Sequence, residues 1–240
     1  MGLVYAFYSF PTGYFLLPFL LWSVVVFYGC YNINAGFFIR IPCQGDSSEK
    51  KMALTFDDGP SPEYTPAILD ILKMQGVRAT FFCIGRHMVG NEMILERIHA
   101  EGHTIGNHSY SHHFWFDLFS VKRMKADLAS CDALVHAVLQ ITPRMFRPPY
   151  GVTNPQVRDV ILDGNYFPVG WNIRSMDTVI NNPGRLFQRV VSRFTPGAVI
   201  LFHDSKQVTV DILNEIIRES RDQGYQLVTV DQLFKIQPYE

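Results

Sequence analysis

Cysteine is scarce in this chain, and neither sign of charge is in large excess. The four cysteines among 240 residues show no paired metal-binding spacing, so we predict no disulfide framework. A formal net charge of −1 gives no indication of nucleic-acid binding. Internal repeats and low-complexity segments are also lacking, which argues against a repeat architecture. Since 48% of the residues are hydrophobic, the chain can build an ample packed core.

Charged side chains are absent from residues 1–39. Within this region, residues 14–31 are almost wholly apolar and carry aromatic residues at both ends. A membrane-spanning helix needs about 20 apolar residues, so we predict an N-terminal transmembrane segment within residues 1–31. A cleaved signal peptide fits less well, because the segment has no basic stretch and no small-residue cleavage site. A helix buried in the soluble domain also fits poorly, because no polar stripe is available to face water.

Beyond residue 50 the chain alternates between strand and helix patterns. Residues 32–50 are predicted to be a connector, because proline, glycine and a polar run separate them from the first apolar strand. About seven alternations in residues 51–240 predict one barrel-like parallel sheet rather than two domains. The expected strands cover residues 52–56, 79–83, 104–106, a short stretch ending at 147, 166–171, 198–202 and 226–229. The expected helices include one after Pro62 that Gly76 ends, with apolar residues at 68, 69, 71 and 72, and further helices at residues 91–100, 121–139, 155–162, 183–194 and 208–223.

Two adjacent carboxylates, Asp57 and Asp58, follow the apolar strand of residues 52–56. In parallel α/β folds the carboxyl end of a strand carries the ligand site. Two close carboxylates repel each other when both are ionised, and a bound divalent cation relieves that repulsion. The structural alternative is a turn with a helix-capping aspartate, which is the commoner role of an isolated Asp-Asp-Gly-Pro sequence.

Two histidines, His108 and His112, follow the strand of residues 104–106. A spacing of four residues would place both imidazoles on one face of a helix, at the separation that a single metal ion requires. Such a pair also occurs by chance on ordinary helices, so alone it is only suggestive. The neighbouring His113 is expected to lie on the wall of the site or on the surface.

Three further polar clusters lie at predicted strand ends. Arg147 precedes a proline-fixed loop at residues 148–151, residues 171–177 carry a tryptophan, an arginine and an aspartate, and His203 ends an apolar strand. Each has a structural alternative, namely an ion-paired arginine, a core tryptophan or a capped strand end. Five polar clusters that face one mouth of a parallel sheet share no such alternative, and together they predict a ligand site.

These motifs resemble the polysaccharide deacetylases with a NodB-homology domain, carbohydrate esterase family 4. The resemblance covers about residues 51–234. The sequences TFDDGP at 55–60, HSYSH at 108–112, RPPYG at 147–151 and LFH at 201–203 agree with the first, second, third and fifth family motifs. The resemblance implies a distorted (β/α) barrel, commonly seven-stranded, that hydrolyses N-acetyl groups of amino sugars. It also implies a divalent metal, usually Zn²⁺, with Co²⁺, Mn²⁺ and Ni²⁺ as alternatives.

The resemblance implies roles for individual side chains at the matching positions. Asp58, His108 and His112 would be the metal ligands. Asp57 would be the general base, oriented by Arg147, and His203 would be the general acid, oriented by Asp177. The backbone N–H of Tyr150 would bind the oxyanion, and Leu201 would line the acetyl pocket. The chemistry agrees with these roles. Two histidines and one carboxylate leave coordination positions open, and a bound divalent ion lowers the pKa of water to about 7.

The fourth family motif is where this sequence departs from the pattern. The family usually has Asp-x-x-Asp-Trp, whereas this chain has Arg174 and Thr178 in place of the first aspartate and the tryptophan, with Asp177 retained. Loss of a large aromatic wall predicts a wider or wetter pocket. A fixed charge at Arg174 predicts a preference for substrates with a carboxylate or phosphate. Alternatively, Arg174 only pairs with an acid on the barrel rim.

The leading functional hypothesis is a metal-dependent hydrolase that removes N-acetyl groups from a cell-wall or extracellular polysaccharide, such as peptidoglycan or a chitin-like glycan. One alternative is a deacylase or deformylase of a lipid-linked sugar, which a membrane segment would suit. Another is a non-catalytic glycan-binding descendant. The expected partners are an N-acetylated glycan and the membrane, with no nucleic acid.

The side of the membrane on which residues 51–240 lie is a separate question. Arg40, Lys50 and Lys51 follow the apolar segment, and the positive-inside rule would keep the following domain in the cytoplasm. Long domains often override that rule, and the glycan substrates lie outside. We therefore expect a single-pass protein of the cytoplasmic membrane with an extracytoplasmic catalytic domain.

Overall fold

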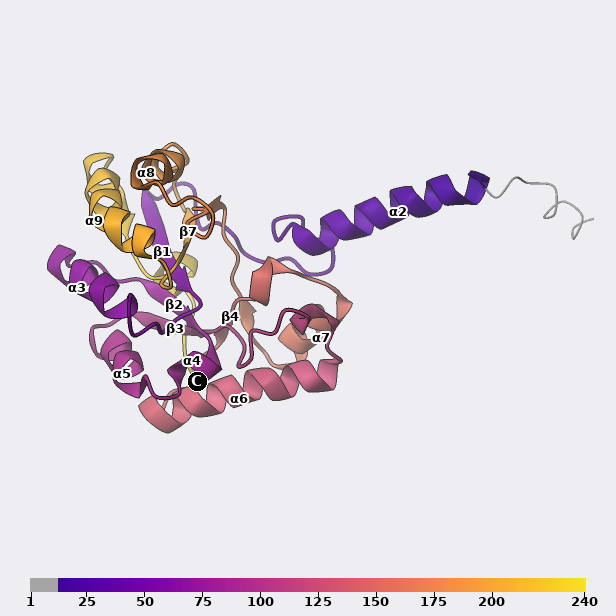
Figure 1. The fold of residues 1–240 in the computed structure, drawn as a ribbon, viewed down its shortest axis with the longest axis horizontal. Helices are drawn as coiled ribbons and strands as arrows, with labels where there is room; N and C mark the ends of the chain where they lie inside the picture. The colour runs from indigo at the N-terminus through magenta and orange to yellow at the C-terminus, as the bar shows by residue number, and fades with distance from the viewer. Residues whose placement is uncertain (1–12) are drawn as a thin grey trace, which may run out of the picture.

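The computed structural model of this protein describes residues 13–240, so the predicted transmembrane segment lies partly outside the described residues. Helix α2 (Gly13–Tyr31) extends away from the rest of the molecule (Figure 1). Most of its side chains from Leu16 onwards are exposed. Within the described part of the chain, no helix combines the length and apolar character needed to cross a membrane. The transmembrane segment therefore stays a prediction.

A sheet of parallel strands forms the centre of the molecule, with β1 in its interior between β2 and β7 (Figure 1). Seven strands follow one another in the order β5-β4-β3-β2-β1-β7-β6, and β8 pairs with the start of β1 off this path. This order confirms the predicted seven-stranded, barrel-like parallel sheet. The strands are β1 (Lys51–Asp57), β2 (Thr80–Cys83), β3 (Thr104–Asn107), β4 (Met145–Phe146), β5 (Phe167–Pro168), β6 (Ile173–Arg174), β7 (Val199–His203) and β8 (Gln226–Leu227).

The strand register brings the predicted site residues to one edge of the sheet. Residues 52–57 of β1 are buried, as expected for a strand that is covered on both faces. Asp57 at the carboxyl end of β1 is paired with His203 at the end of β7. On the other side of β1, Asn107 at the end of β3 is paired with Phe146, the residue before Arg147. The carboxyl ends of four strands therefore meet where the sequence predicted a ligand site.

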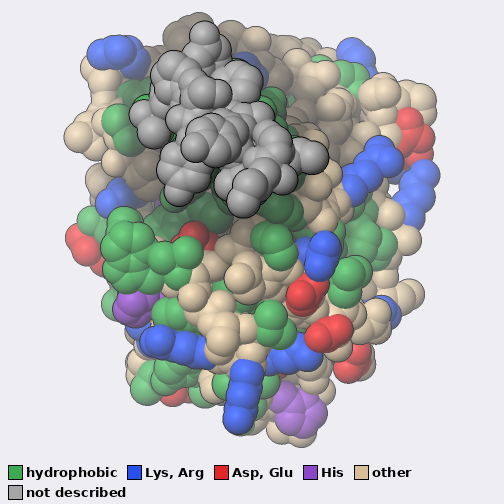
Figure 2. Space-filling model, turned by 90° about the vertical axis from the view of Figure 1, so that its right-hand side faces the viewer, with side chains coloured by type: hydrophobic (Ala, Val, Ile, Leu, Met, Phe, Trp, Pro, Cys, Tyr) green, Lys and Arg blue, Asp and Glu red, His purple; other side chains and the backbone are tan. Residues whose placement is uncertain are grey.

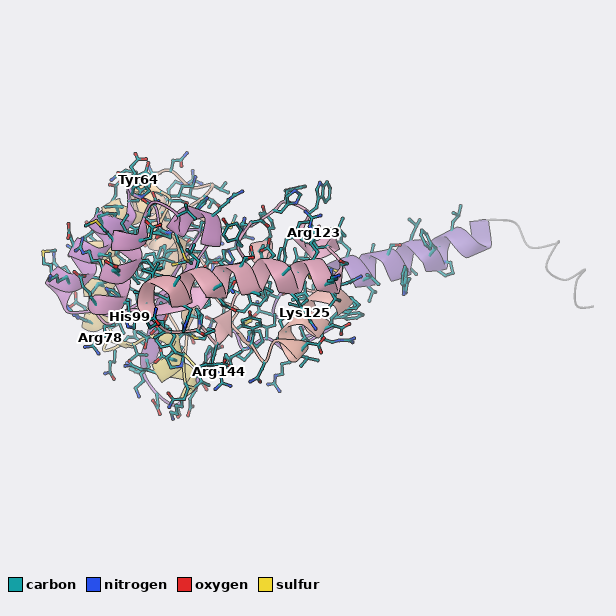
Figure 3. The ribbon with its side chains drawn as sticks, turned by 90° about the horizontal axis from the view of Figure 1, so that it is seen from below. Tyr64, Arg78, His99, Arg123, Lys125 and Arg144 are labelled. Atoms are coloured by element: carbon teal, nitrogen blue, oxygen red, sulfur yellow. The ribbon has the colours of Figure 1, made fainter. Side chains whose placement is uncertain are left out.

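Helices cover the outside of the sheet. Figure 1 shows α8, α9, α3 and α5 around one side, and α8 and α3 both pack against α9. Figure 3 shows α6 along its length, with Arg123 and Lys125 on opposite sides of it. The helices of the barrel are α3 (Thr65–Gln75), α4 (Gly85–Met88), α5 (Glu92–Ala100), α6 (Val121–Leu139), α7 (Pro155–Asp163), α8 (Pro183–Val191), α9 (Gln207–Asp222) and α10 (Val230–Phe234), with short 3₁₀ turns η1 (Phe116–Leu118) and η2 (Pro149–Gly151).

Local sequence signals explain where several of these helices begin and end. The Asn154 side chain accepts a hydrogen bond from the N–H of Val157, and Pro155 occupies the first position of α7. Helix α3 ends at Gly76, which has a left-handed φ of 59° that glycine adopts without strain. In the core between sheet and helices, the ring of Phe56 stacks on that of Phe81 at 5.0 Å.

The region predicted as a connector packs onto the barrel. Ile33, Ile41 and Cys43 are buried in the same apolar cluster as Trp171. Gln44 forms an antiparallel bridge with Ala198 at the start of β7. Residues 32–50 therefore form an irregular segment that contributes apolar side chains to the core.

One predicted strand differs in the structure. Instead of a continuous strand over residues 166–171, β5 covers Phe167–Pro168 and the unpredicted strand β6 forms at Ile173–Arg174. Between them the backbone of Gly170 passes close to the Cys43 sulfur, so close that a Cβ atom would lie 2.4 Å from it. This approach of the connector interrupts the strand, and the local apolar pattern did not reveal it.

Candidate active site

The base predicted from sequence, Asp57, is held by a buried arginine. The Arg147 Nη1 atom lies 2.6 Å from Asp57 Oδ1 and also donates a hydrogen bond to the Thr55 hydroxyl at 2.8 Å. The remaining guanidinium donors reach the carbonyl oxygens of Val169 and Gly170, so the arginine is fixed in one orientation. Burial raises the pKa of the Asp57 carboxyl, and the charge of Arg147 opposes that rise. The structure thus brings Arg147 to the carboxylate that it was predicted to orient.

Asp58, His108 and His112 come together as a set of three donors, as predicted. Their ligand atoms all lie within 4.8 Å of one another, with Asp58 Oδ1 at 3.6 Å from His108 Nε2 and 3.5 Å from His112 Nε2. The Nδ1 atom of His108 lies 2.7 Å from the Arg147 carbonyl oxygen, which can only accept a hydrogen bond. Nδ1 therefore carries the proton, and the lone pair is on Nε2, facing Asp58.

Burial also favours the neutral form of both imidazoles. It lowers the pKa of His108 to about 3 and lowers the pKa of His112 as well. Two neutral imidazoles and one carboxylate are a donor set that suits a divalent ion such as Zn²⁺. The residues present therefore fit the metal that the sequence predicted.

The two histidines do not lie on a helix, and that part of the prediction was wrong. The segment after β3 turns back on itself, with left-handed φ values of 65° at Ser109 and 41° at His112. The Asp127 carboxylate on α6 accepts hydrogen bonds from the N–H groups of Tyr110 and Ser111 and holds this turn in place. Asp58 is also left-handed, with φ 78°. Positive φ values cost energy in residues other than glycine, and they concentrate at functional sites.

The predicted acid, His203, forms a second buried pair with Asp177. His203 Nδ1 lies 2.7 Å from Asp177 Oδ1. The other carboxylate oxygen accepts hydrogen bonds from the backbone N–H of His203 and from the hydroxyl of Thr209. Burial alone would favour neutral His203, but the hydrogen bond and charge of Asp177 outweigh it and raise the pKa of His203 to about 9. His203 is therefore a cation at neutral pH.

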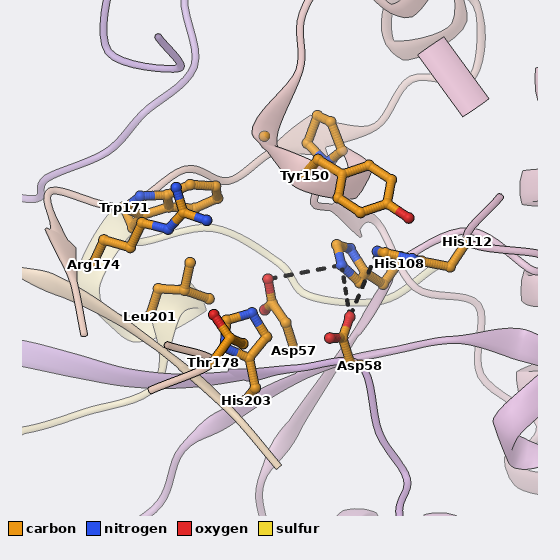
Figure 4. Close-up of a pocket in the computed structure, with 12 residues that line it drawn as sticks. Asp57, Asp58, His108, His112, Tyr150, Trp171, Arg174, Thr178, Leu201 and His203 are labelled. Atoms are coloured by element: carbon orange, nitrogen blue, oxygen red, sulfur yellow. Dashed lines mark ion pairs between the residues drawn. The ribbon is translucent and has the colours of Figure 1, made fainter. Parts of the chain in front are cut away.

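A pocket of about 220 Å³ opens between these groups (Figure 4). The predicted acetyl-pocket residue Leu201 lines it, as does Tyr150. Tyr150 has a left-handed φ of 58°, and its N–H donates to no other group among the described residues. That N–H is available as an oxyanion donor. The residues that line the pocket are Asp57, Asp58, His108, His112, Pro148, Tyr150, Gly151, Trp171, Arg174, Thr178, Leu201 and His203.

The departures in the fourth motif both lie at this pocket. Thr178 lines it, and Trp171, which belongs to one of the five clusters predicted to face the site, supplies an aromatic wall with its ring close to Gly151. Arg174 is exposed at the pocket and forms no ion pair with any residue that the structure describes. The loss of an aromatic wall that Thr178 suggested is therefore offset by Trp171. The alternative for Arg174, an ion pair with an acid on the rim, is not formed within residues 13–240.

Sequence reasoning also missed Asp204, which supports the loop that carries both aspartates. Its side chain is fully buried, accepts a hydrogen bond from the Thr65 hydroxyl at 2.6 Å, and has a pKa that burial raises to about 7. Any Cβ atom at Gly59 would lie 1.9 Å from its Oδ2 atom, so only glycine fits there. The signal for this residue was its position directly after His203.

The comparison with known families agrees with this geometry. A family model described as polysaccharide deacetylase matches residues 44–168. The chain belongs to the polysaccharide deacetylase family. This membership confirms the resemblance seen in the sequence motifs.

Several relatives of this deacetylase-family chain have names that refer to peptidoglycan. It is 34% identical over 187 residues to the peptidoglycan-N-acetylglucosamine deacetylase PgdA of Listeria monocytogenes, covering 78% of this chain and 39% of the relative. It is 37% identical over 196 residues to the peptidoglycan-N-acetylmuramic acid deacetylase PdaC of Bacillus subtilis, covering 80% and 40%. The chain thus spans about two fifths of the length of these relatives. The crystal structure of the Bc1960 peptidoglycan N-acetylglucosamine deacetylase aligns with a TM-score of 0.79 and 31% identity, over 82% of this chain and 94% of that one.

Proposed function

We propose that this protein is a metal-dependent hydrolase that removes N-acetyl groups from the amino sugars of a cell-wall or extracellular polysaccharide. One observation carries the proposal, namely that a three-donor metal site and two proton carriers of opposite character line the same pocket. Asp57 is a buried carboxylate suited to accept a proton, and His203 is a cation suited to donate one. The named peptidoglycan deacetylases among its relatives support the same substrate class.

Each residue has a defined part in amide hydrolysis. A divalent ion such as Zn²⁺, held by Asp58, His108 and His112, would supply Lewis-acid polarisation and a nucleophilic water at neutral pH. Asp57 accepts the proton of the attacking water. Arg147 fixes the orientation of the Asp57 carboxylate for this proton transfer. In this proposal the Tyr150 N–H donates a hydrogen bond to the oxyanion, and one such donor typically contributes about 3 kcal/mol.

The departing amine needs a proton, and His203 holds one at the opposite side of the pocket from His112 (Figure 4). Asp177 keeps the Nδ1 side of the His203 ring occupied, which leaves Nε2 as the proton donor. Once the proton has left, the imidazole is neutral and Asp177 favours its return to the cation. The acid is thus restored for the next turnover.

Arg174, which forms no ion pair with the residues that the structure describes, favours an anionic glycan as the substrate. Its guanidinium can bind a carboxylate, which peptidoglycan carries on lactyl and peptide groups and a neutral chitin-like chain lacks. We therefore place peptidoglycan ahead of chitin-like polymers.

Membrane anchoring through residues 1–31, with the catalytic domain outside the cytoplasmic membrane, is part of this proposal. It is supported by the absence of charge from residues 1–39 and by the exposed apolar side chains of α2. Protease treatment of intact spheroplasts tests it. Digestion of the domain from outside is expected, and full protection would instead favour a cytoplasmic hydrolase that acts on a precursor.

The function is tested by acetate release from peptidoglycan fragments and chitooligosaccharides by the full chain in detergent micelles. We expect acetate release that a chelator abolishes and added Zn²⁺ restores. Release of formate, or turnover of lipid-linked sugars alone, would replace this proposal with a lipid-linked deacylase. Glycan binding without any acyl release would indicate a non-catalytic protein.

A further inference from the structure

We propose that the exposed rings of Phe114 and Trp115 extend the pocket into an aromatic platform, which binds the sugar units next to the unit that reacts. Tyr150 joins this platform to the pocket. The inference rests on the proposed function, since it describes how the same site would hold a longer glycan.

Three aromatic rings continue from the pocket to the outer surface. Tyr150 lines the pocket and its ring centroid lies 4.7 Å from that of His112. The Phe114 ring lies 6.1 Å from the Tyr150 ring at an interplanar angle of 69°. The Trp115 ring lies 4.7 Å from the Phe114 ring at 77°. These edge-to-face contacts fix the three rings relative to one another.

The platform is exposed although its rings are large and apolar. Phe114 is 66% exposed and Trp115 is 56% exposed, while the next residue, Phe116, is buried in the core. The N–H of Trp115 donates a hydrogen bond to His113 Nδ1, which holds the intervening turn. The chain therefore anchors one ring inside and presents two outside. Adjacent exposed aromatic rings beside a pocket indicate a binding surface.

The size of the pocket indicates what this surface binds. At about 220 Å³ it is smaller than the roughly 300–1,000 Å³ of most ligand pockets, so a polymer can place only about one sugar unit inside. Its neighbouring units must lie on the rim. Figure 4 shows Arg174 on one side of the pocket and Tyr150 on the other. The aromatic side suits the C–H faces of pyranose rings, which pack on electron-rich ring faces.

A lipid surface is the competing partner for the same rings. Leu118 is also exposed nearby, and the Thr153 N–H donates a hydrogen bond to the Cys30 carbonyl at the end of α2. However, Figure 2 shows the face on the α2 side with hydrophobic side chains in separate groups between charged ones, apart from the area that the grey residues cover. The unbroken contact from Phe114 through Tyr150 to the pocket favours the glycan.

The test measures how affinity depends on oligosaccharide length. Binding of chitobiose and chitopentaose to the full chain in detergent micelles is compared by calorimetry for the native protein and for Phe114→Ala/Trp115→Ala. Leu162→Ala serves as the matched control, because Leu162 is equally exposed on α7 but lies outside the pocket and the platform. Circular dichroism confirms that each variant is folded.

The native protein and the control should bind the pentamer more tightly than the dimer, and the double variant should lose about tenfold in affinity for the pentamer. Equal pentamer affinity in the native protein and the double variant would overturn the platform. A Trp115-dependent emission shift on phosphatidylglycerol vesicles, with sugar affinities unchanged in the double variant, would overturn it in favour of lipid. Acetate is measured in the same samples. Length-dependent binding without acetate release would support the platform and reject the deacetylase. Acetate release with equal pentamer affinities in the native protein and the double variant would support the deacetylase and reject the platform.

Discussion

Two buried pairs of a carboxylate and a cation lie next to each other at the carboxyl ends of β1 and β7, and they differ in which partner can exchange a proton. Arg147 contacts Asp57 at 2.6 Å, and His203 contacts Asp177 at 2.7 Å. In the first pair the cation cannot lose its proton, so only the carboxylate can exchange one. In the second pair the carboxylate is held ionised, so the imidazole is the group that can exchange a proton. Nearly the same contact therefore suits a base in one pair and an acid in the other.

The surroundings reinforce this division. Burial raises the pKa of Asp57, which makes it a better proton acceptor, while Asp177 raises the pKa of His203 and keeps the proton on the ring. The two proton carriers also have a different kind of backbone from two of the proposed metal ligands. Asp57 and His203 are neighbours across regular parallel strands, whereas the metal ligands Asp58 and His112 have left-handed backbones. Regular strands position the two proton carriers, whereas two of the three proposed metal donors lie in left-handed turns.

The largest effect on activity is expected for Asp57→Asn. The amide has the same shape but cannot accept a proton, so turnover should fall about 10²- to 10⁴-fold. Metal content, measured by mass spectrometry of the purified protein, should stay the same because Asp58 and the histidines are unchanged. Near-normal acetate release would show that another group is the base.

Removal of the cation from the same pair should act on stability. Arg147→Met leaves the Asp57 charge buried without its partner, which typically costs about 3–5 kcal/mol in the free energy of unfolding. Urea denaturation measures this loss. The double variant Asp57→Asn/Arg147→Met should recover part of it, because no buried charge then remains. A double variant less stable than Arg147→Met would contradict the explanation.

The second pair should control the pH dependence of turnover. The pKa of His203 is about 9 in the folded protein, above its ordinary value of 6.5. Its ion pair with Asp177 therefore contributes fully to the stability of the fold below pH 6.5. This contribution is lost as the pH rises through 9. The same deprotonation removes the acid, so kcat should fall above about pH 9. Asp177→Asn should move this alkaline limb to lower pH and remove the stability change. If the alkaline fall in kcat stayed at the same pH in Asp177→Asn, a group other than His203 would be responsible for it.

A smaller effect is expected at the rim. Arg174→Ala should weaken binding of carboxylate-bearing peptidoglycan fragments about tenfold and leave neutral chitooligosaccharides nearly unaffected. The matched control is Arg185→Ala, an exposed arginine on α8 outside the pocket. KM values for both substrates provide the measurement. An equal change on the two substrates would make Arg174 part of the scaffold.

The sequence predicted most of the site because the motifs follow strands. Asp57, Arg147 and His203 come directly after apolar stretches, and parallel strands bring their carboxyl ends together regardless of the details of packing. The same logic predicted the sheet and most helices. The contacts between segments that are distant in the sequence were harder to predict.

The missed features depend on contacts between distant segments. The break between β5 and β6 coincides with the close approach of Gly170 to Cys43, and no local pattern records that approach. The turn from His108 to His112 depends on the Asp127 carboxylate of α6, so spacing alone suggested a helix instead. The support of Gly59 by Asp204 is a further contact of this kind.

The metal site is the central claim, and the metal content of His112→Ala tests it most directly. His113→Ala is the matched control, since His113 is the adjacent histidine and lies outside the three-donor set. After dialysis against Zn²⁺, the native protein and His113→Ala should each retain about one equivalent, whereas His112→Ala should lose most of its metal and its acetate release while staying folded. Full metal occupancy in folded His112→Ala would contradict the assignment of Asp58, His108 and His112.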